Sequence, residues 1–236
     1  PEWSPQGKAL PRTWRELEWE RGVGAHWIEL AALALDLPLP SRVRVLQDSP
    51  VLRLGLQLFT SDPKKDWDLQ NWWSLAERLR EIFPEIEVSF LVAPFEVDRL
   101  TETQNRDPRL RILRWPQLEN YLSDLDLLVS GDTSVLHLAV EKGVRCLGLY
   151  MGSAQALSSG PYQLNPWVLQ ASSRCFPCGP SSVCEQTRHW CGDSIKVESV
   201  FDELFKYIEG RKNAKLSVQS GDSVPFVKSS ANHLAL

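Results

Sequence analysis

Short apolar runs alternate with longer amphipathic segments through the middle of the chain. The runs fit strands that are buried in a parallel sheet, and they lie at 54–59, 87–92, 109–113, 127–129 and 145–149. The segments between them repeat apolar residues at helical spacing and predict helices at 72–83, 95–102, 116–122 and 134–142. This alternation predicts right-handed crossovers and an α/β fold, a Rossmann-like parallel sheet with helices on both faces.

The segments that flank the alternation have patterns of their own. Residues 26–35 predict a helix that ends before two prolines, and residues 13–21 predict a short polar helix. Residues 194–210 predict a closing helix with one apolar face, and the polar tail 211–236 is expected to be disordered or loosely docked. The predicted division is therefore a linker region at 1–50, a Rossmann-like domain at 51–210 and a polar tail at 211–236.

The stretch 126–143 joins a buried strand to a helix through a turn of small and polar residues. Thr133 or Ser134 can cap the first turn of that helix, and Gly143 can close the last. The unpaired N–H groups at the helix start and the helix dipole both favour an anion such as phosphate beyond the sheet edge. His137 lies one helical turn further on, on roughly the same side. The stretch therefore predicts a phosphate site, although such turns also cap helices that bind nothing.

Two further loops follow predicted strands at the same edge, where ligands of open α/β sheets bind. The first carries Thr60, Ser61 and Lys65, whose hydroxyl and ammonium groups can bind a diphosphate. The second carries Glu96, whose carboxylate can accept hydrogen bonds from ribose hydroxyls, or can simply be an acidic residue at a helix start. The chain has no G-x-G-x-x-G motif, so a dinucleotide redox cofactor is not expected.

Four cysteines, Cys175, Cys178, Cys184 and Cys191, lie within 17 residues. Four reduced thiolates at this spacing can form a tetrahedral zinc site, and the alternative is a metal-free loop that is reduced or tied by a disulfide. Cys146 lies inside a predicted strand and is expected to be a small buried apolar residue.

Charge and hydropathy narrow the classes of partner. The chain has 26 Lys and Arg against 30 Asp and Glu, a net charge of −4, and no face is evidently basic, so no nucleic-acid partner is expected. The longest apolar stretch, 27–39, is far shorter than the roughly 20 uncharged residues of a membrane span. No signal peptide is visible after Pro1, so a cytoplasmic location is expected.

The segment GDTSVLHLAVEKGVRCLGLY at 131–150 resembles an element of the heptosyltransferase group, glycosyltransferase family 9. The matching positions are Asp132, Thr133, His137, Leu138, Ala139, Gly143, Leu149 and Tyr150. The loop at 60–67 is similar to a second element of that family, with Lys65 at the position of the family lysine. Ser134 stands where the family usually has glycine, and Arg145 stands where it has proline.

This resemblance implies the C-terminal, donor-binding domain of a GT-B glycosyltransferase. It implies transfer of a sugar, heptose from ADP-heptose, onto a lipopolysaccharide core or other glycan acceptor at the inner face of the inner membrane. With the strand-end positions it assigns donor binding to Thr60, Ser61, Lys65, Glu96, Asp132, Thr133, Ser134, Val135 and His137.

The resemblance also bears on chemistry and on what the chain lacks. If Lys65 and the helix start carry the diphosphate charge, transfer needs no metal cofactor. The acceptor site, the catalytic base and any peripheral membrane contact are expected in an N-terminal half, and the resemblance implies that this chain lacks that half. The alternative is a non-catalytic nucleotide- or sugar-binding module, which Ser134 and the altered loop at 151–153 keep open.

Overall fold

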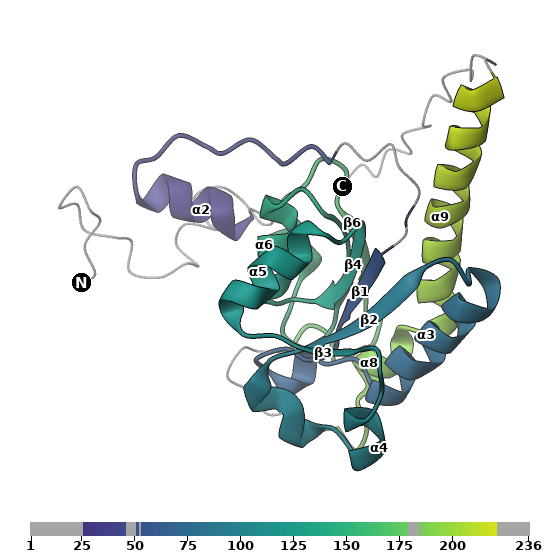
Figure 1. Ribbon diagram of the computed structural model, residues 1–236. Helices are drawn as coiled ribbons and strands as arrows, with labels where there is room; N and C mark the ends of the chain where they lie inside the picture. The colour runs from purple at the N-terminus through teal and green to yellow at the C-terminus, as the bar shows by residue number, and fades with distance from the viewer. Residues whose placement is uncertain (1–25, 46–50, 52, 179–183, 185, 221–236) are drawn as a thin grey trace.

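The structure is a computed structural model that describes residues 26–45, 51, 53–178, 184 and 186–220, with side chains described up to residue 212. The described residues form one six-stranded parallel sheet in the order β3-β2-β1-β4-β5-β6 (Figure 1). The strands are β1 (Arg53–Gln57), β2 (Glu87–Val92), β3 (Leu110–Ile112), β4 (Leu127–Gly131), β5 (Arg145–Tyr150) and β6 (Trp167–Gln170). The predicted parallel sheet is confirmed, and β6 is an additional strand at its edge.

Helices cover both faces of the sheet (Figure 1). The α-helices are α2 (Trp27–Ala34), α3 (Leu69–Ile82), α4 (Glu102–Asn105), α5 (Trp115–Ser123), α6 (Ser134–Glu141), α7 (Ala156–Ser159), α8 (Trp190–Ser194) and α9 (Val197–Ser220). Two 3₁₀ helices, η1 (Pro63–Lys65) and η2 (Pro94–Arg99), follow β1 and β2.

Two apolar clusters fill the space between the sheet and its helices. Along β4, Leu127 and Val129 face the cluster formed with α3 and α9, while Leu128 faces the cluster formed with α5 and α6. Successive side chains of a strand point to opposite faces, so a strand between two helical layers needs apolar residues at every position. This requirement explains the unbroken apolar runs in the sequence.

Two predicted helices differ from the observed ones. The segment 95–102 is not one helix, because η2 begins at Pro94 and a separate short α4 follows it. The closing helix α9 begins three residues later than predicted and continues to Ser220, into the segment predicted to be a polar tail. Lys212 explains part of this extension, since it forms ion pairs with Glu85 and Glu209 and its ammonium lies 4.5 Å from the ring centroid of Phe83.

Residues 26–45 lie against the segment that follows α7. His26 caps α2, and its Nε2 lies 2.9 Å from the carbonyl oxygen of Gly160. Val43 forms a parallel bridge with Gln163. The helix predicted at 26–35 is thus present as α2, whereas the one predicted at 13–21 falls outside the described residues. No helix in the described part of the chain is both long enough and apolar enough to cross a membrane.

Candidate functional site

A cavity of about 930 Å³ opens at the carboxyl ends of β1, β2 and β4. All nine residues that the sequence assigns to donor binding line it, together with side chains of α2 and α5. Ligand sites of proteins typically have volumes of about 300 to 1,000 Å³, so the cavity is large enough for a nucleotide sugar.

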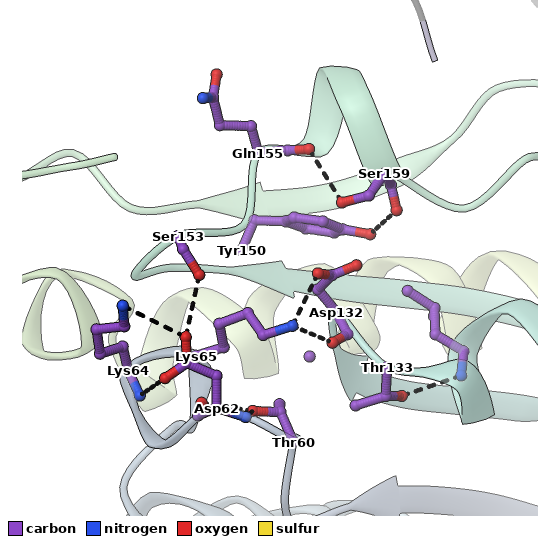
Figure 2. A network of polar contacts seen from close by, with 12 residues as sticks. Thr60, Asp62, Lys64, Lys65, Asp132, Thr133, Tyr150, Ser153, Gln155 and Ser159 are labelled. Carbon is purple, nitrogen blue, oxygen red and sulfur yellow. Dashed lines mark hydrogen bonds and ion pairs between the residues drawn. The ribbon is translucent and has the colours of Figure 1, made fainter. Parts of the chain in front are cut away.

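Lys65 and Asp132 meet in this cavity although 67 positions separate them. The Lys65 ammonium donates to the carboxylate Oδ2 and to the main-chain oxygen of Asp132, each at 3.1 Å (Figure 2). The two side chains are only 14% and 18% exposed. The pairing follows from the sheet order, because β1 and β4 are neighbours and their following loops therefore meet.

His137 approaches the same carboxylate from the first turns of α6. Its Nε2 lies 3.8 Å from Asp132 Oδ1, the oxygen that Lys65 does not contact. Burial alone would raise the pKa of Asp132, but the interactions with His137 and Lys65 outweigh it and hold the pKa below its ordinary value. Asp132 is therefore a carboxylate at neutral pH, held between two basic side chains.

The turn between β4 and α6 has the predicted geometry of a helix cap. Thr133, rather than Ser134, is the N-cap residue, and its hydroxyl accepts a hydrogen bond of 3.1 Å from the N–H of Leu136. The N–H groups of Ser134 and Val135 belong to the first turn, where an α-helix offers no intrahelical acceptor, and both residues line the cavity. The positive end of the α6 dipole is therefore directed at the cavity.

The loop after β1 is held largely by its own polar groups. The Thr60 hydroxyl donates to the carbonyl of Asp62 at 2.7 Å, and the Thr60 N–H donates to Asp66 Oδ1 at 2.7 Å. Asp62 caps η1 by accepting from the N–H of Lys64 at 3.0 Å. The Thr60 hydroxyl thus shapes the loop, and its contact with a ligand stays a prediction, as do the contacts of Ser61 and Lys65.

Glu96 lies in η2 and is 7% exposed. Its Oε2 accepts a hydrogen bond of 2.9 Å from the N–H of Ala93, which is the local capping role that the sequence left as an alternative. Burial raises the pKa of Glu96, and the hydrogen bond from Ala93 only partly opposes this. Glu96 also lines the cavity, so the capping contact and a contact with a ligand are compatible.

The apolar side of the cavity was missed by sequence reasoning. It is formed by Trp27, Phe95, Leu113, Trp115 and Leu118. Phe95 is 84% exposed and Trp115 is 54% exposed, which is unusual for such large apolar side chains. Both follow a strand at its carboxyl end, and this position was the available signal in the sequence.

Two of the four clustered cysteines, Cys178 and Cys191, contact Gly152 in the turn after β5. Cys191 is buried, and its sulfur accepts from the N–H of Gly152 at 3.4 Å, while the N–H of Cys178 donates to the Gly152 carbonyl at 2.8 Å. Among the residues that the structure describes, no group of three or more His, Cys, Asp or Glu side chains is placed to hold a metal ion, so a zinc site is not supported. Cys146 is fully buried in β5, as predicted, and burial raises the pKa of its thiol.

Comparisons with known proteins test the resemblance found in the sequence. The family model "Glycosyltransferase family 9 (heptosyltransferase)" matches residues 23–186, which confirms the resemblance found in the sequence. The comparison with curated protein sequences finds no match.

Several solved structures share the fold at low sequence identity. ADP-heptose lipopolysaccharide heptosyltransferase II of E. coli matches with a TM-score of 0.51 and 15% identity over 70% of this chain and 48% of its own. The E. coli heptosyltransferase WaaC with ADP matches with a TM-score of 0.51 and 18% identity over 78% and 54%. A family 9 glycosyltransferase of Veillonella parvula matches with a TM-score of 0.53 and 16% identity over 86% and 53%. The chain therefore has the α/β fold of GT-B glycosyltransferases and spans about half the length of these proteins.

Proposed function

This chain belongs to glycosyltransferase family 9, and we propose that it binds an ADP-sugar donor in the cavity at the carboxyl edge of its sheet. In this proposal it takes part in the transfer of the sugar, a heptose, from ADP-heptose to a lipopolysaccharide core or another glycan. The observation that carries the proposal is the convergence of the Lys65 ammonium and the N-terminus of α6 on one cavity.

The diphosphate belongs between Lys65 and the start of α6. A helix N-terminus offers N–H groups and a partial positive charge to an anion, and an ammonium adds a full charge. Lys65 is 14% exposed, so water screens its charge less than it would screen that of a surface lysine. His137 lies beside the same turn and can donate a further hydrogen bond to the phosphates.

The rest of the donor fits the remaining walls of the cavity. The planar base suits the apolar side, where the exposed rings of Phe95 and Trp115 offer surfaces for stacking. In the sheet, β2 lies between β3 and β1, so the loop that carries Glu96 lies between the loop that leads to Trp115 and the loop that carries Lys65. The Glu96 carboxylate therefore suits the ribose hydroxyls, between the base and the diphosphate. Asp132 would be repelled by phosphate, so we assign it to the sugar hydroxyls.

Transfer of the sugar leaves a nucleoside diphosphate with an additional negative charge on the departing oxygen. Groups that are already oriented toward that oxygen stabilise it more than water does, because they need no reorganisation during the reaction. Lys65 and the α6 N-terminus supply such groups in this chain. We assign the general base and the acceptor site to no residue described here.

Isothermal titration calorimetry of the purified chain with ADP, UDP and GDP tests the proposal. We expect ADP to bind most tightly, and an ADP-sugar to bind at least as well. Exclusive binding of UDP or UDP-sugars would overturn the heptosyltransferase assignment, and absence of binding by all three diphosphates would overturn the donor site itself.

A non-catalytic binding module of the same fold is the second candidate. Ser134 supports it, because this residue lines the cavity at a position where the family usually has glycine, and a side chain there takes up space beside the phosphates. Ser134→Gly tests the support that Ser134 gives to this candidate: an increase in ADP affinity of about tenfold, equal to 1.4 kcal/mol, would show that the side chain obstructs the phosphates, and an unchanged affinity would remove that support.

A further inference from the structure

The main-chain carbonyl of Lys64 is contacted by His189 and by Gly152, which are both distant from it in the sequence. The Nε2 of His189, next to the start of α8, lies 2.8 Å from this carbonyl oxygen, and since a carbonyl only accepts, the imidazole donates. Gly152, in the turn after β5, approaches the same peptide so closely that a Cβ at this position would lie 2.2 Å from the oxygen. Gly152 also has a φ of +64°, a conformation that other residues rarely adopt.

The two contacting residues are themselves fixed by their neighbours. Gly192 lets the His189 ring lie on the backbone of α8, because a Cβ there would be 2.5 Å from Nδ1. The N–H of Gly152 donates to the sulfur of Cys191, and its carbonyl accepts from the N–H of Cys178. The cysteine segment therefore supports Gly152 through ordinary hydrogen bonds.

The peptide unit that joins Lys64 to Lys65 determines the position of the Lys65 backbone. The carbonyl of Lys64 and the N–H of Lys65 belong to one rigid planar unit, so fixing that carbonyl fixes the Cα of Lys65. Ser153, adjacent to Gly152, also donates to Asp62 Oδ2 at 3.2 Å, and Asp62 caps η1 (Figure 2). The loop that presents Lys65 to the cavity thus rests on the β5–α7 turn and on α8.

We propose that His189 and Gly152 are positioning residues that hold Lys65 where its ammonium contacts the donor diphosphate. Neither residue lines the large cavity, and His189 instead lines a smaller one of about 270 Å³ on the other side of the loop. Their effect on a ligand therefore passes through the Lys64–Lys65 peptide. The inference rests on the proposed function only in its assumption that Lys65 contacts a diphosphate.

His189→Ala and Gly152→Ala test this arrangement, and each has a matched control. Trp190→Ala removes a neighbouring ring that is 54% exposed, and Gly210→Ala adds a methyl group where nothing lies within 4 Å. His189→Gln restores a side-chain N–H donor of similar reach. Calorimetry measures the Kd for ADP and for adenosine, which has no phosphate, and hydrogen exchange measures protection of the 60–65 amides.

We expect His189→Ala to raise the Kd for ADP about 3- to 10-fold, the effect of losing one neutral hydrogen bond, and Gly152→Ala to raise it at least as much. The Kd for adenosine should stay within about 2-fold, His189→Gln should recover most of the ADP affinity, and both controls should resemble the unchanged chain. Exchange at 60–65 should become faster in the two alanine variants and stay unchanged in the controls.

Three outcomes would overturn the inference, and they are distinguishable. Unchanged ADP affinity in both alanine variants, with ADP bound by the unchanged chain, refutes the positioning role alone. An equal loss for ADP and adenosine indicates general structural damage and refutes it as well. Failure of the unchanged chain to bind ADP refutes the positioning role together with the proposed function.

Discussion

Lys65→Met removes the ammonium of Lys65 while keeping a flexible apolar stem of similar length. In the proposed site this ammonium contacts the diphosphate, and losing a hydrogen bond to a charged group costs about 1.5 to 3 kcal/mol. We therefore expect the Kd for ADP to rise about 10- to 150-fold. The loss should be larger at low ionic strength, because salt screens the part that is due to charge.

The same substitution also removes a partner of Asp132 in the free protein. At 3.1 Å the gross attraction between the two charges is about 5 kcal/mol for an effective dielectric constant of 20. Desolvation offsets most of this attraction, because both side chains are largely buried. We expect a net coupling of about 1 to 2 kcal/mol in the free energy of unfolding, between the values typical of exposed and fully buried pairs.

A double-mutant cycle of Lys65→Met and Asp132→Asn measures both quantities. Urea unfolding of the four proteins gives the coupling energy, and calorimetry gives the Kd for ADP. Asp132→Asn alone should change the ADP affinity less than about 3-fold. It removes the repulsion between the carboxylate and the phosphates, which strengthens binding, and it removes the ion pair that orients Lys65, which weakens binding. Its effect on ADP-sugar binding should be a larger loss. A Lys65→Met protein that is folded by circular dichroism and binds ADP within 2-fold of the unchanged chain would refute the assignment of Lys65 to the diphosphate.

Three further predictions concern the cap of α6 and the docking of α2. Thr133→Val should lower the free energy of unfolding by about 1 kcal/mol and weaken ADP binding, and Thr133→Ser should restore both in urea unfolding and calorimetry. His137→Ala should weaken ADP binding by about 1 kcal/mol, measured by calorimetry. An unchanged Kd for ADP would contradict the proposed contact between His137 and the phosphates. Burial lowers the pKa of His26 below its ordinary value of 6.5, so the unfolded chain takes up the proton first and stability should fall as the pH drops below about 6.5. Urea unfolding between pH 7.5 and pH 5 tests this, because the free energy of unfolding should depend less on pH in His26→Gln than in the unchanged chain.

The strand-end residues of the site could be predicted because they depend on local patterns. An apolar run followed by a polar turn and a helix places Thr133 at the carboxyl edge of a sheet, whatever the order of the strands. The contact between Lys65 and Asp132 could not be predicted in the same way. It depends on β1 and β4 being neighbours, which the sheet order shows and a list of strands along the chain does not.

The errors of the sequence reading have physical causes of the same kind. β6 was missed because it is a short edge strand of partly exposed residues, preceded by a helix of only four residues instead of a full crossover helix. The extension of α9 was missed because its polar residues gain partners from the segment between α3 and β2, as Lys212 does from Glu85. The assignment of the Thr60 hydroxyl to the diphosphate stays a prediction, and in the structure this hydroxyl donates to the main-chain oxygen of Asp62.

The charge distribution of the site has one more consequence for donor binding. Lys65 and Asp132 cancel each other's charge in the free protein, so the attraction for a diphosphate before contact depends chiefly on the α6 N-terminus and its dipole. A bound diphosphate competes with Asp132 for the ammonium, and a carboxylate released in this way is free to accept hydrogen bonds from the sugar. Donor recognition in the proposed site is therefore an exchange of partners, in which the phosphate contact of Lys65 and the sugar contact of Asp132 form together. This coupling is the reason to expect Asp132→Asn to distinguish an ADP-sugar from ADP, whereas Lys65→Met should weaken the binding of both.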